Sequence, residues 1–144
     1  MFSITGFDGE DHKFNFSHGR RRKHQSNKSK LHVQARELIS ELFPNRSVYE
    51  EVTLPGSKRP GRTSLLYADF FIPDLMLVLE PHGRQHYEYV PFFYQNRLDF
   101  AKAQRRDRDK KEWCELNDIL LVELPYNETK QWKQIVQESL KLRN

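Results

Sequence analysis

The sequence predicts a single α/β sandwich, in which helices flank a central mixed sheet, and three observations support this fold class. The chain has 144 residues, which is the usual size of one domain. Its apolar residues switch between helical and strand spacing in the order helix, three strands, helix, strand, helix. Hydrophobic residues make up 37% and charged residues 31%, which allows one modest core and excludes collagen-like, coiled-coil and fully disordered chains.

The first 30 residues are predicted to form a basic arm, and the domain is predicted to span residues 31–144. Aromatic residues spaced between Gly and Asp in residues 1–17 allow a short hairpin. Residues 12–36 contain eight Lys or Arg and no Asp or Glu, so this stretch attracts polyanions, nucleic acid first. The alternative is a solvated arm without a partner. The predicted nucleic-acid contacts in the arm are Arg20, Arg21, Arg22 and Lys23.

Three elements are expected in the first half of the domain. A helix is predicted over residues 30–43, where apolar residues follow helical spacing and Ser29 can cap the first turn. Residues 47–54 are predicted to form a strand. The following residues 55–63 are rich in Pro, Gly and basic side chains, and they are predicted to form a loop.

The most informative segment is residues 65–80, which is predicted to form two strands joined at Pro73-Asp74. With a two-residue connection, Asp69 pairs with residue 78, and Asp69 and Glu80 become diagonal neighbours within about 7–8 Å. Both carboxylates then share the face opposite the apolar one. The residues predicted on the apolar, buried face are Ala68, Phe70, Ile72, Leu75, Leu77 and Leu79.

The second half of the chain is predicted to contain a helix, a strand and a terminal helix. The helix spans residues 92–117 and is broken near its middle. Residues 119–124 are almost continuously apolar, which is typical of an interior strand covered on both faces. Residues 129–142 form the terminal helix, with Trp132 and other apolar residues on one side.

Asp69 and Glu80 are the candidate metal ligands. Two neighbouring carboxylates repel one another unless a cation lies between them, and Mg²⁺ or Mn²⁺ prefers such oxygen ligands. A divalent ion held there could activate water for attack on a phosphodiester. From the spacing alone, two solvent-facing residues of an edge hairpin are the favoured interpretation. The side chains after Glu80 favour the functional interpretation, because imidazole, amide and guanidinium groups follow within six residues.

These side chains are His82, Arg84, Gln85 and His86, and Gly83 permits a close turn among them. His82 has the strand parity of Glu80, so it can join the same face and act as a general base or position water. Arg84 can meet a phosphate. A zinc site from the two histidines is also conceivable, although no third soft ligand stands out in the sequence.

At this point the residues resemble a known nuclease family. The segments LYADFFIP at 66–73, EPHGRQH at 80–86, Asp107, and WCELNDI at 113–119 resemble the PD-(D/E)XK nuclease superfamily. The nearest branch is a phage-type group related to very-short-patch repair and homing endonucleases, with the pattern aDFyIP, E-x-[HD]-G-x-QH, D-x-x-K and C-x-x-N-x-I. The resemblance covers about residues 31–126 and implies a restriction-endonuclease-like fold.

The resemblance also implies an activity, namely Mg²⁺-dependent DNA cleavage (with Mn²⁺ as an alternative ion) that leaves a 5′-phosphate and a 3′-hydroxyl. Asp69 and Glu80 would hold the metal, and His82 would take the slot where many members carry a lysine. Gln85 and His86 would position substrate or water. The superfamily often adds a Glu or Gln from the first helix, and Gln34, Glu37 and Glu41 compete for this role, with Glu37 taken as the candidate.

Further basic residues form a predicted phosphate-binding surface. Residues 97–111 hold seven Lys or Arg against three Asp. Such contacts position a nucleic acid without reading its sequence. Aromatic residues between Tyr87 and Tyr94 either stack on bases or close the small core. The predicted phosphate contacts outside the arm are Lys58, Arg59, Arg62, Arg84, Arg105 and Arg106.

Other features narrow the class of protein. No apolar run approaches the ~18 residues of a membrane span, and no Gly-rich phosphate loop or small-molecule cofactor motif is evident. The single cysteine excludes an intramolecular disulfide and fits a cytoplasmic protein, in a bacterial host if the chain is phage-encoded.

A monomer would nick DNA, and a homodimer would cut both strands. The alternatives are a non-catalytic nucleic-acid binder that retains a nuclease fold, or a nuclease for RNA or branched DNA.

Neutralising Arg20, Arg21 and Arg22 together is expected to weaken DNA binding and to flatten its salt dependence, while the chemistry of cleavage stays unchanged. The reason is that each lost phosphate contact removes counterion release from the binding free energy. DNA affinity measured against salt concentration checks this expectation. An unchanged salt slope in the triple variant would contradict it.

Overall fold

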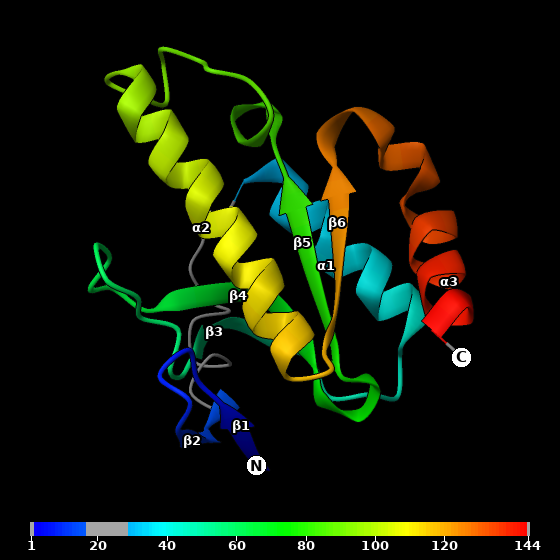
Figure 1. Cartoon of the computed structure of the whole chain (residues 1–144). Helices are drawn as coiled ribbons and strands as arrows, with labels where there is room; N and C mark the ends of the chain where they lie inside the picture. The colour runs from blue at the N-terminus through cyan, green and yellow to red at the C-terminus, as the bar shows by residue number, and fades with distance from the viewer. Residues whose placement is uncertain (1, 17–28, 144) are drawn as a thin grey trace.

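The computed structural model describes residues 2–16 and 29–143, and the predicted arm contacts at 20–23 lie outside these residues. Figure 1 shows the arrangement of the helices and strands. In chain order the strands and α-helices are β1 (Phe2–Thr5), β2 (Asp11–Phe14), α1 (Lys30–Leu42), β3 (Tyr49–Leu54), β4 (Leu66–Ile72), β5 (Leu77–His82), α2 (Arg97–Leu116), β6 (Leu120–Pro125) and α3 (Trp132–Arg143). Short 3₁₀ turns occupy Pro73–Leu75 (η2), Arg84–His86 (η3) and Tyr126–Gln131 (η4).

The central sheet is mixed, as predicted. Its strand order is β3-β4-β5-β6. The first three strands pair antiparallel, whereas β5 and β6 run parallel and are connected through α2. The fold is therefore a single α/β domain with helices packed on the sheet.

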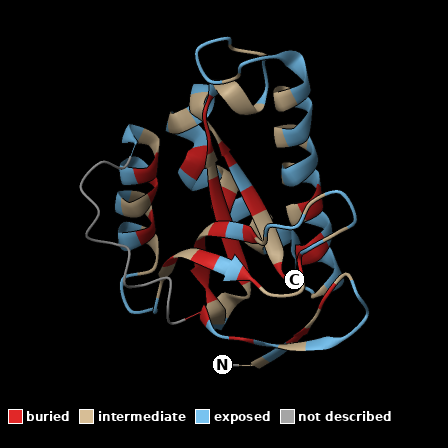
Figure 2. Cartoon of the chain, turned by 90° about the vertical axis from the view of Figure 1, so that its left-hand side faces the viewer, coloured by how far each residue is buried: buried red, intermediate tan, exposed pale blue. Residues whose placement is uncertain are grey.

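Each face of the sheet is covered by a separate apolar cluster. On one face, Trp113 of α2 packs with Phe71 of β4 and with the β1–β2 hairpin. On the other face, Ile39 of α1 and Val136 of α3 pack against β4, β5 and β6. Figure 2 shows this pattern as buried residues that follow the strands and the inner sides of the helices. The sheet is therefore the middle layer between two apolar clusters.

The hairpin expected near the N-terminus is present. Strands β1 and β2 pair antiparallel, and Phe14 is fully buried. The ring of Phe14 stacks on Phe71 with centroids 5.0 Å apart and meets Trp113 edge-on at 5.6 Å. Residues 2–16 therefore pack against the sheet, and they contribute to the core of the domain.

The connection between β4 and β5 is longer than predicted. It consists of η2 followed by Met76, whose backbone is left-handed with φ 47°, instead of the two residues Pro73-Asp74. The register therefore pairs Phe70 with Leu79 and Ile72 with Leu77, two residues away from the prediction. Because the shift is even, the paired residues 70–72 and 77–79 keep their predicted faces. Asp69 consequently lies directly opposite Glu80 and not diagonal to it.

Two further expectations about the sheet are corrected. The face shared by the carboxylates is also buried, since Phe71 and Val78 are fully covered by the cluster of α2 and the hairpin. Ala68 belongs to this cluster too, and not to the cluster of Phe70; it lies in the part of β4 that pairs with β3 and extends beyond the β4–β5 pairing. Strand β6 is covered by helices on both faces, as expected, but it lies at the sheet edge and not in the interior.

The helices begin and end close to the predicted residues, with one exception. The Ser29 side chain caps α1 by accepting a hydrogen bond from the backbone N–H of His32 at 3.2 Å, as predicted. Helix α2 is continuous and begins only at Arg97, because the Asn96 side chain caps it by accepting from the backbone N–H of Asp99. The predicted start at residue 92 and the predicted break are therefore wrong. Within residues 2–16 and 29–143, no helix is long and apolar enough to cross a bilayer.

Candidate active site

Asp69 and Glu80 meet at the centre of the candidate site. They lie on neighbouring strands β4 and β5, and the backbone N–H of Asp69 donates to Glu80 Oε2 at 2.5 Å. The Glu80 side chain is buried, whereas Asp69 is partly exposed. Lys110 reaches the pair from α2, and its Nζ donates to Glu80 Oε1 at 2.5 Å. Two carboxylates and one ammonium group thus share a site between the sheet and α2.

The site opens into a pocket of about 560 Å³. Strand β4, the turn η3, helix α2 and the loop before α2 all contribute to its walls. Both polar side chains and aromatic rings line it. The polar lining residues are Ser64, Asp69, Gln85, His86, Arg106, Asp107 and Lys110, and the aromatic ones are Tyr67, Phe93 and Tyr94.

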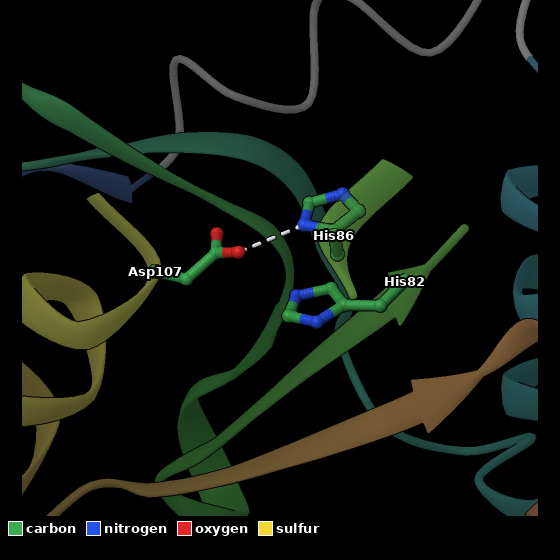
Figure 3. A group of neighbouring side chains, drawn as sticks. All are labelled: His82, His86 and Asp107. Carbon is green, nitrogen blue, oxygen red and sulfur yellow. Dashed lines mark hydrogen bonds and ion pairs between the residues drawn. The ribbon is translucent and has the colours of Figure 1, made fainter. Parts of the chain in front are cut away.

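The two predicted histidines lie side by side (Figure 3), and Nε2 of His82 is 3.9 Å from Glu80 Oε1. His82 ends β5, and His86 lies on η3, with ring centroids 4.0 Å apart and planes only 4° from parallel. The Nδ1 atom of His86 is hydrogen-bonded to Asp107 Oδ2 of α2 at 2.9 Å. A Cβ at Gly83 would lie 2.4 Å from Gln85 Oε1, so a larger residue there would require the Gln85 side chain to move.

The carboxyl groups of Asp69 and Glu80 have strongly different pKa values. Burial, together with the neighbouring Glu80 charge, raises the pKa of Asp69 to about 7. Burial alone would raise the pKa of Glu80 as well, but Lys110, His82 and the Asp69 N–H hold it low, at about 2. The same partnership raises the pKa of Lys110 despite its burial. Glu80 is therefore the ionised partner of Lys110, whereas at Asp69 the effects of Lys110 and His82 are outweighed by burial and by the Glu80 charge.

The first-helix candidate does not join this group. Glu37 lies on α1, which packs against the sheet face opposite α2. With Gln34 and Glu41 it lines a different pocket, beside Trp132 and Lys133. None of the three competing first-helix residues lines the pocket that contains Asp69.

Two of the predicted phosphate contacts are engaged in ion pairs. Arg59 binds Asp109 at 2.7 Å and Glu112 at 2.7 Å, and Arg62 binds Asp109 at 3.0 Å. Asp109 is buried, and the Arg62 side chain is only 11% exposed. These contacts fasten the loop before β4 to α2, which is a structural role.

The other predicted contacts in the described residues are exposed. Arg84 lies on the surface and pairs with Glu88 at 2.6 Å. Lys58, Arg105 and Arg106 are exposed, and Arg106 also lines the pocket. Their contact with nucleic acid stays a prediction.

Lys110 and Asp107 are functional candidates that the sequence prediction does not assign to the site. Both belong to the D-x-x-K motif, but their charges are indistinguishable in sequence from the other charges of α2. The available signal is spacing, because residues three apart lie on the same helix face. The i, i+3 relation places both side chains toward the sheet.

Comparison with known proteins finds viral relatives, each described as uncharacterized. The chain is 39% identical over 61 residues to protein 307L of Invertebrate iridescent virus 6, covering 42% of this chain and 31% of the relative. It is 32% identical over 103 residues to protein 094L of Frog virus 3, covering 71% and 65% respectively. It is 30% identical over 98 residues to protein 033L of Invertebrate iridescent virus 3, covering 68% and 50%.

The chain thus spans between about a third and two thirds of the length of these relatives. No protein-family model matches the chain. No solved structure matches it either.

Proposed function

We propose that the protein is a Mg²⁺-dependent DNA endonuclease with a restriction-endonuclease-like fold. The observation that carries the proposal is the meeting of Asp69, Glu80 and Lys110, in which Asp69 and Lys110 line an open pocket and the buried Glu80 contacts both of them. An acidic pair with an adjacent ammonium group suits hydrolysis of a phosphodiester, in which negative charge develops on the phosphate.

The residues present fit a divalent metal ion. Asp69 lines the pocket, and its pKa is raised by burial and by Glu80, so a cation placed beside it would relieve the repulsion. Asp69 and Glu80 would hold the ion, which would activate water and neutralise charge on the phosphate. Mn²⁺ has the same ligand preference and is the alternative ion.

Lys110 favours catalysis over the alternative of a non-catalytic binder. The absence of a lysine two residues after Glu80 is the main argument for the binder. Lys110 comes instead from α2, with Nζ at Glu80 and the side chain on the pocket wall. It would hold Glu80 in place and offer a positive charge to the scissile phosphate.

His86 is the group best placed to handle a proton. Its Nδ1 is hydrogen-bonded to Asp107 at 2.9 Å, which orients the ring at the pocket wall. If Nδ1 donates to the Asp107 carboxylate and no metal ion is bound to this ring, Nε2 would be free to accept a proton from an attacking water. Gln85 and His82 flank the same ring and would help to position water.

The surroundings support a nucleic-acid substrate. The exposed Arg106 lines the pocket, and the chain carries a net charge of +4. The relatives come from viruses of invertebrates and frogs, which favours a viral enzyme over a bacteriophage one. We expect a monomer to nick DNA and a homodimer to cut both strands.

Cleavage of supercoiled plasmid DNA tests the proposal. Wild type should nick or linearise the plasmid with Mg²⁺ or Mn²⁺ and not with EDTA, because metal binding at Asp69 is required. Asp69→Asn should lose this activity and keep DNA binding. Asp74→Asn is the matched control, since Asp74 lies exposed in the turn that joins the same two strands and pairs with Arg46 at 3.7 Å.

Two results would overturn the proposal. Cleavage that survives EDTA or Asp69→Asn would exclude the acidic pair as the metal site. Binding without cleavage of duplex, single-stranded or branched DNA and RNA would instead establish the non-catalytic binder.

A further inference from the structure

Three potential metal ligands gather beside the acidic pair. One ring nitrogen of His82, one of His86 and one carboxylate oxygen of Asp107 all lie within 4.8 Å of one another. They come from β5, η3 and α2, so three separate elements converge there (Figure 3). Asp107 is the third ligand that the sequence alone does not identify.

His82 provides a second, independent observation. Its side chain is only 5% exposed, yet its nearest carboxylate partners within residues 2–16 and 29–143 lie beyond ordinary hydrogen-bond length. The carboxylate oxygens are 3.9 Å from Nε2, in Glu80, and 3.7 Å from Nδ1, in Glu123. His82 is thus a buried imidazole that lies between two carboxylates. Their negative charges would attract a cation placed beside the ring.

We propose that His82, His86 and Asp107 form a binding site for a transition-metal ion, with Zn²⁺ as the preferred occupant. Imidazole nitrogen favours Zn²⁺ and related ions, whereas Mg²⁺ prefers oxygen ligands. The site is therefore chemically distinct from the Asp69–Glu80 pair. It goes beyond the proposed nuclease function and stands whether or not the protein cleaves DNA.

The stacked rings must tilt for both to bind the same ion. Two parallel imidazoles direct their lone pairs along parallel planes, so they cannot meet at one point. The ring torsion is broad, and a modest rotation of each ring is therefore inexpensive. The ion would replace the proton shared by His86 and Asp107, and Glu123 would support Nδ1 of His82 from the opposite side.

Three protein ligands leave a tetrahedral Zn²⁺ ion with one open position. Two of the ligands, His86 and Asp107, line the pocket that also contains Asp69. The open position can therefore take water or a phosphate oxygen. An ion there would lie next to the acidic pair, given the 3.9 Å between His82 and Glu80.

Co²⁺ titration of the full-length, untagged, metal-free protein tests the site. Bound Co²⁺ should produce the visible absorption of a nitrogen- and oxygen-ligated ion at one equivalent, and Zn²⁺ should abolish it by displacement. His86→Gln and Asp107→Asn should each weaken Co²⁺ binding by at least about 10-fold, in line with the cost of disturbing a metal ligand's surroundings. Thermal unfolding of both variants shows whether they remain folded.

Two control variants separate this site from Co²⁺ binding elsewhere on the protein. His12→Gln removes a surface histidine that pairs with Asp8 at 3.0 Å, and it should leave Co²⁺ binding unchanged. Asp69→Asn should also keep the signal, even if it loses cleavage. No absorption in wild type would overturn the proposal. Absorption that persists in His86→Gln and Asp107→Asn, or that disappears in Asp69→Asn, would overturn it as well.

Discussion

Lys110→Met is expected to lower the rate of metal-dependent DNA cleavage by at least about 100-fold. The Lys110 ammonium group is the only cation among the described residues that contacts Glu80 by a hydrogen bond. Without it, Glu80 loses its counter-charge and one of the two hydrogen bonds that hold its carboxylate, and the acidic pair loses the cation that contacts it. Single-turnover cleavage of plasmid DNA measures the chemical step directly.

Two further variants keep this prediction falsifiable. Lys111→Met removes the same charge from the exposed side of the same helix, and it should retain the wild-type rate. Lys110→Arg keeps the charge but not the compact ammonium geometry, so partial activity is expected from a folded protein. Thermal unfolding identifies any variant that is simply unfolded. A folded Lys110→Met variant with the wild-type rate would exclude Lys110 from the chemistry.

Local sequence patterns predicted the strands of the sheet, and β4 and β5 show why this was possible. Asp69 and Glu80 face each other despite a wrong turn length, because alternation of side chains survives any even shift in register. The cap at Ser29 was likewise predictable from the residues beside it. The edge position of β6 was not predictable, because the spacing of apolar residues indicates which faces of a strand are covered. It does not indicate which strands are neighbours.

The contacts that the sequence could not predict join residues that lie far apart along the chain. Lys110 reaches Glu80 across 30 positions, and Arg59 reaches Asp109 across 50. In the sequence, Lys110 and Arg59 are surrounded by other charged residues of α2 and of the loop before β4, so nothing marks their partners. The spacing of Glu37 predicts only that it lies off the apolar stripe of α1, and the sheet then separates it from the carboxylates. The position of α1 on that face is a tertiary property.

The two carboxylates are expected to affect stability in opposite directions in metal-free buffer. Asp69→Asn should stabilise the protein at pH 8, by about 1–2 kcal/mol or about 3–8 °C in Tm, after allowance for its partial exposure. Glu80→Gln should destabilise it by about 3 kcal/mol, because it leaves the Lys110 cation without its partner in a buried setting. Thermal unfolding in EDTA measures both changes.

The stabilisation by Asp69→Asn depends on pH with a defined sign. The pKa of Asp69 rises from 3.8 to about 7 on folding. Between these values the folded chain holds a proton that the unfolded chain has released, so the wild-type free energy of unfolding falls as pH rises. The difference between variant and wild type should therefore be largest above pH 7, according to the Asp69 pKa, and disappear as pH falls toward 4.

Mg²⁺ should reverse the advantage of Asp69→Asn. An ion that binds only the folded wild type raises its Tm by mass action, whereas the variant lacks the ligand that binds the ion. The exposed Asp74→Asn control should follow wild type at each pH and Mg²⁺ concentration. If Asp69→Asn destabilised the protein at pH 8, the carboxylates would not repel one another. The physical argument for a cation at Asp69 and Glu80 would then fail independently of any cleavage assay.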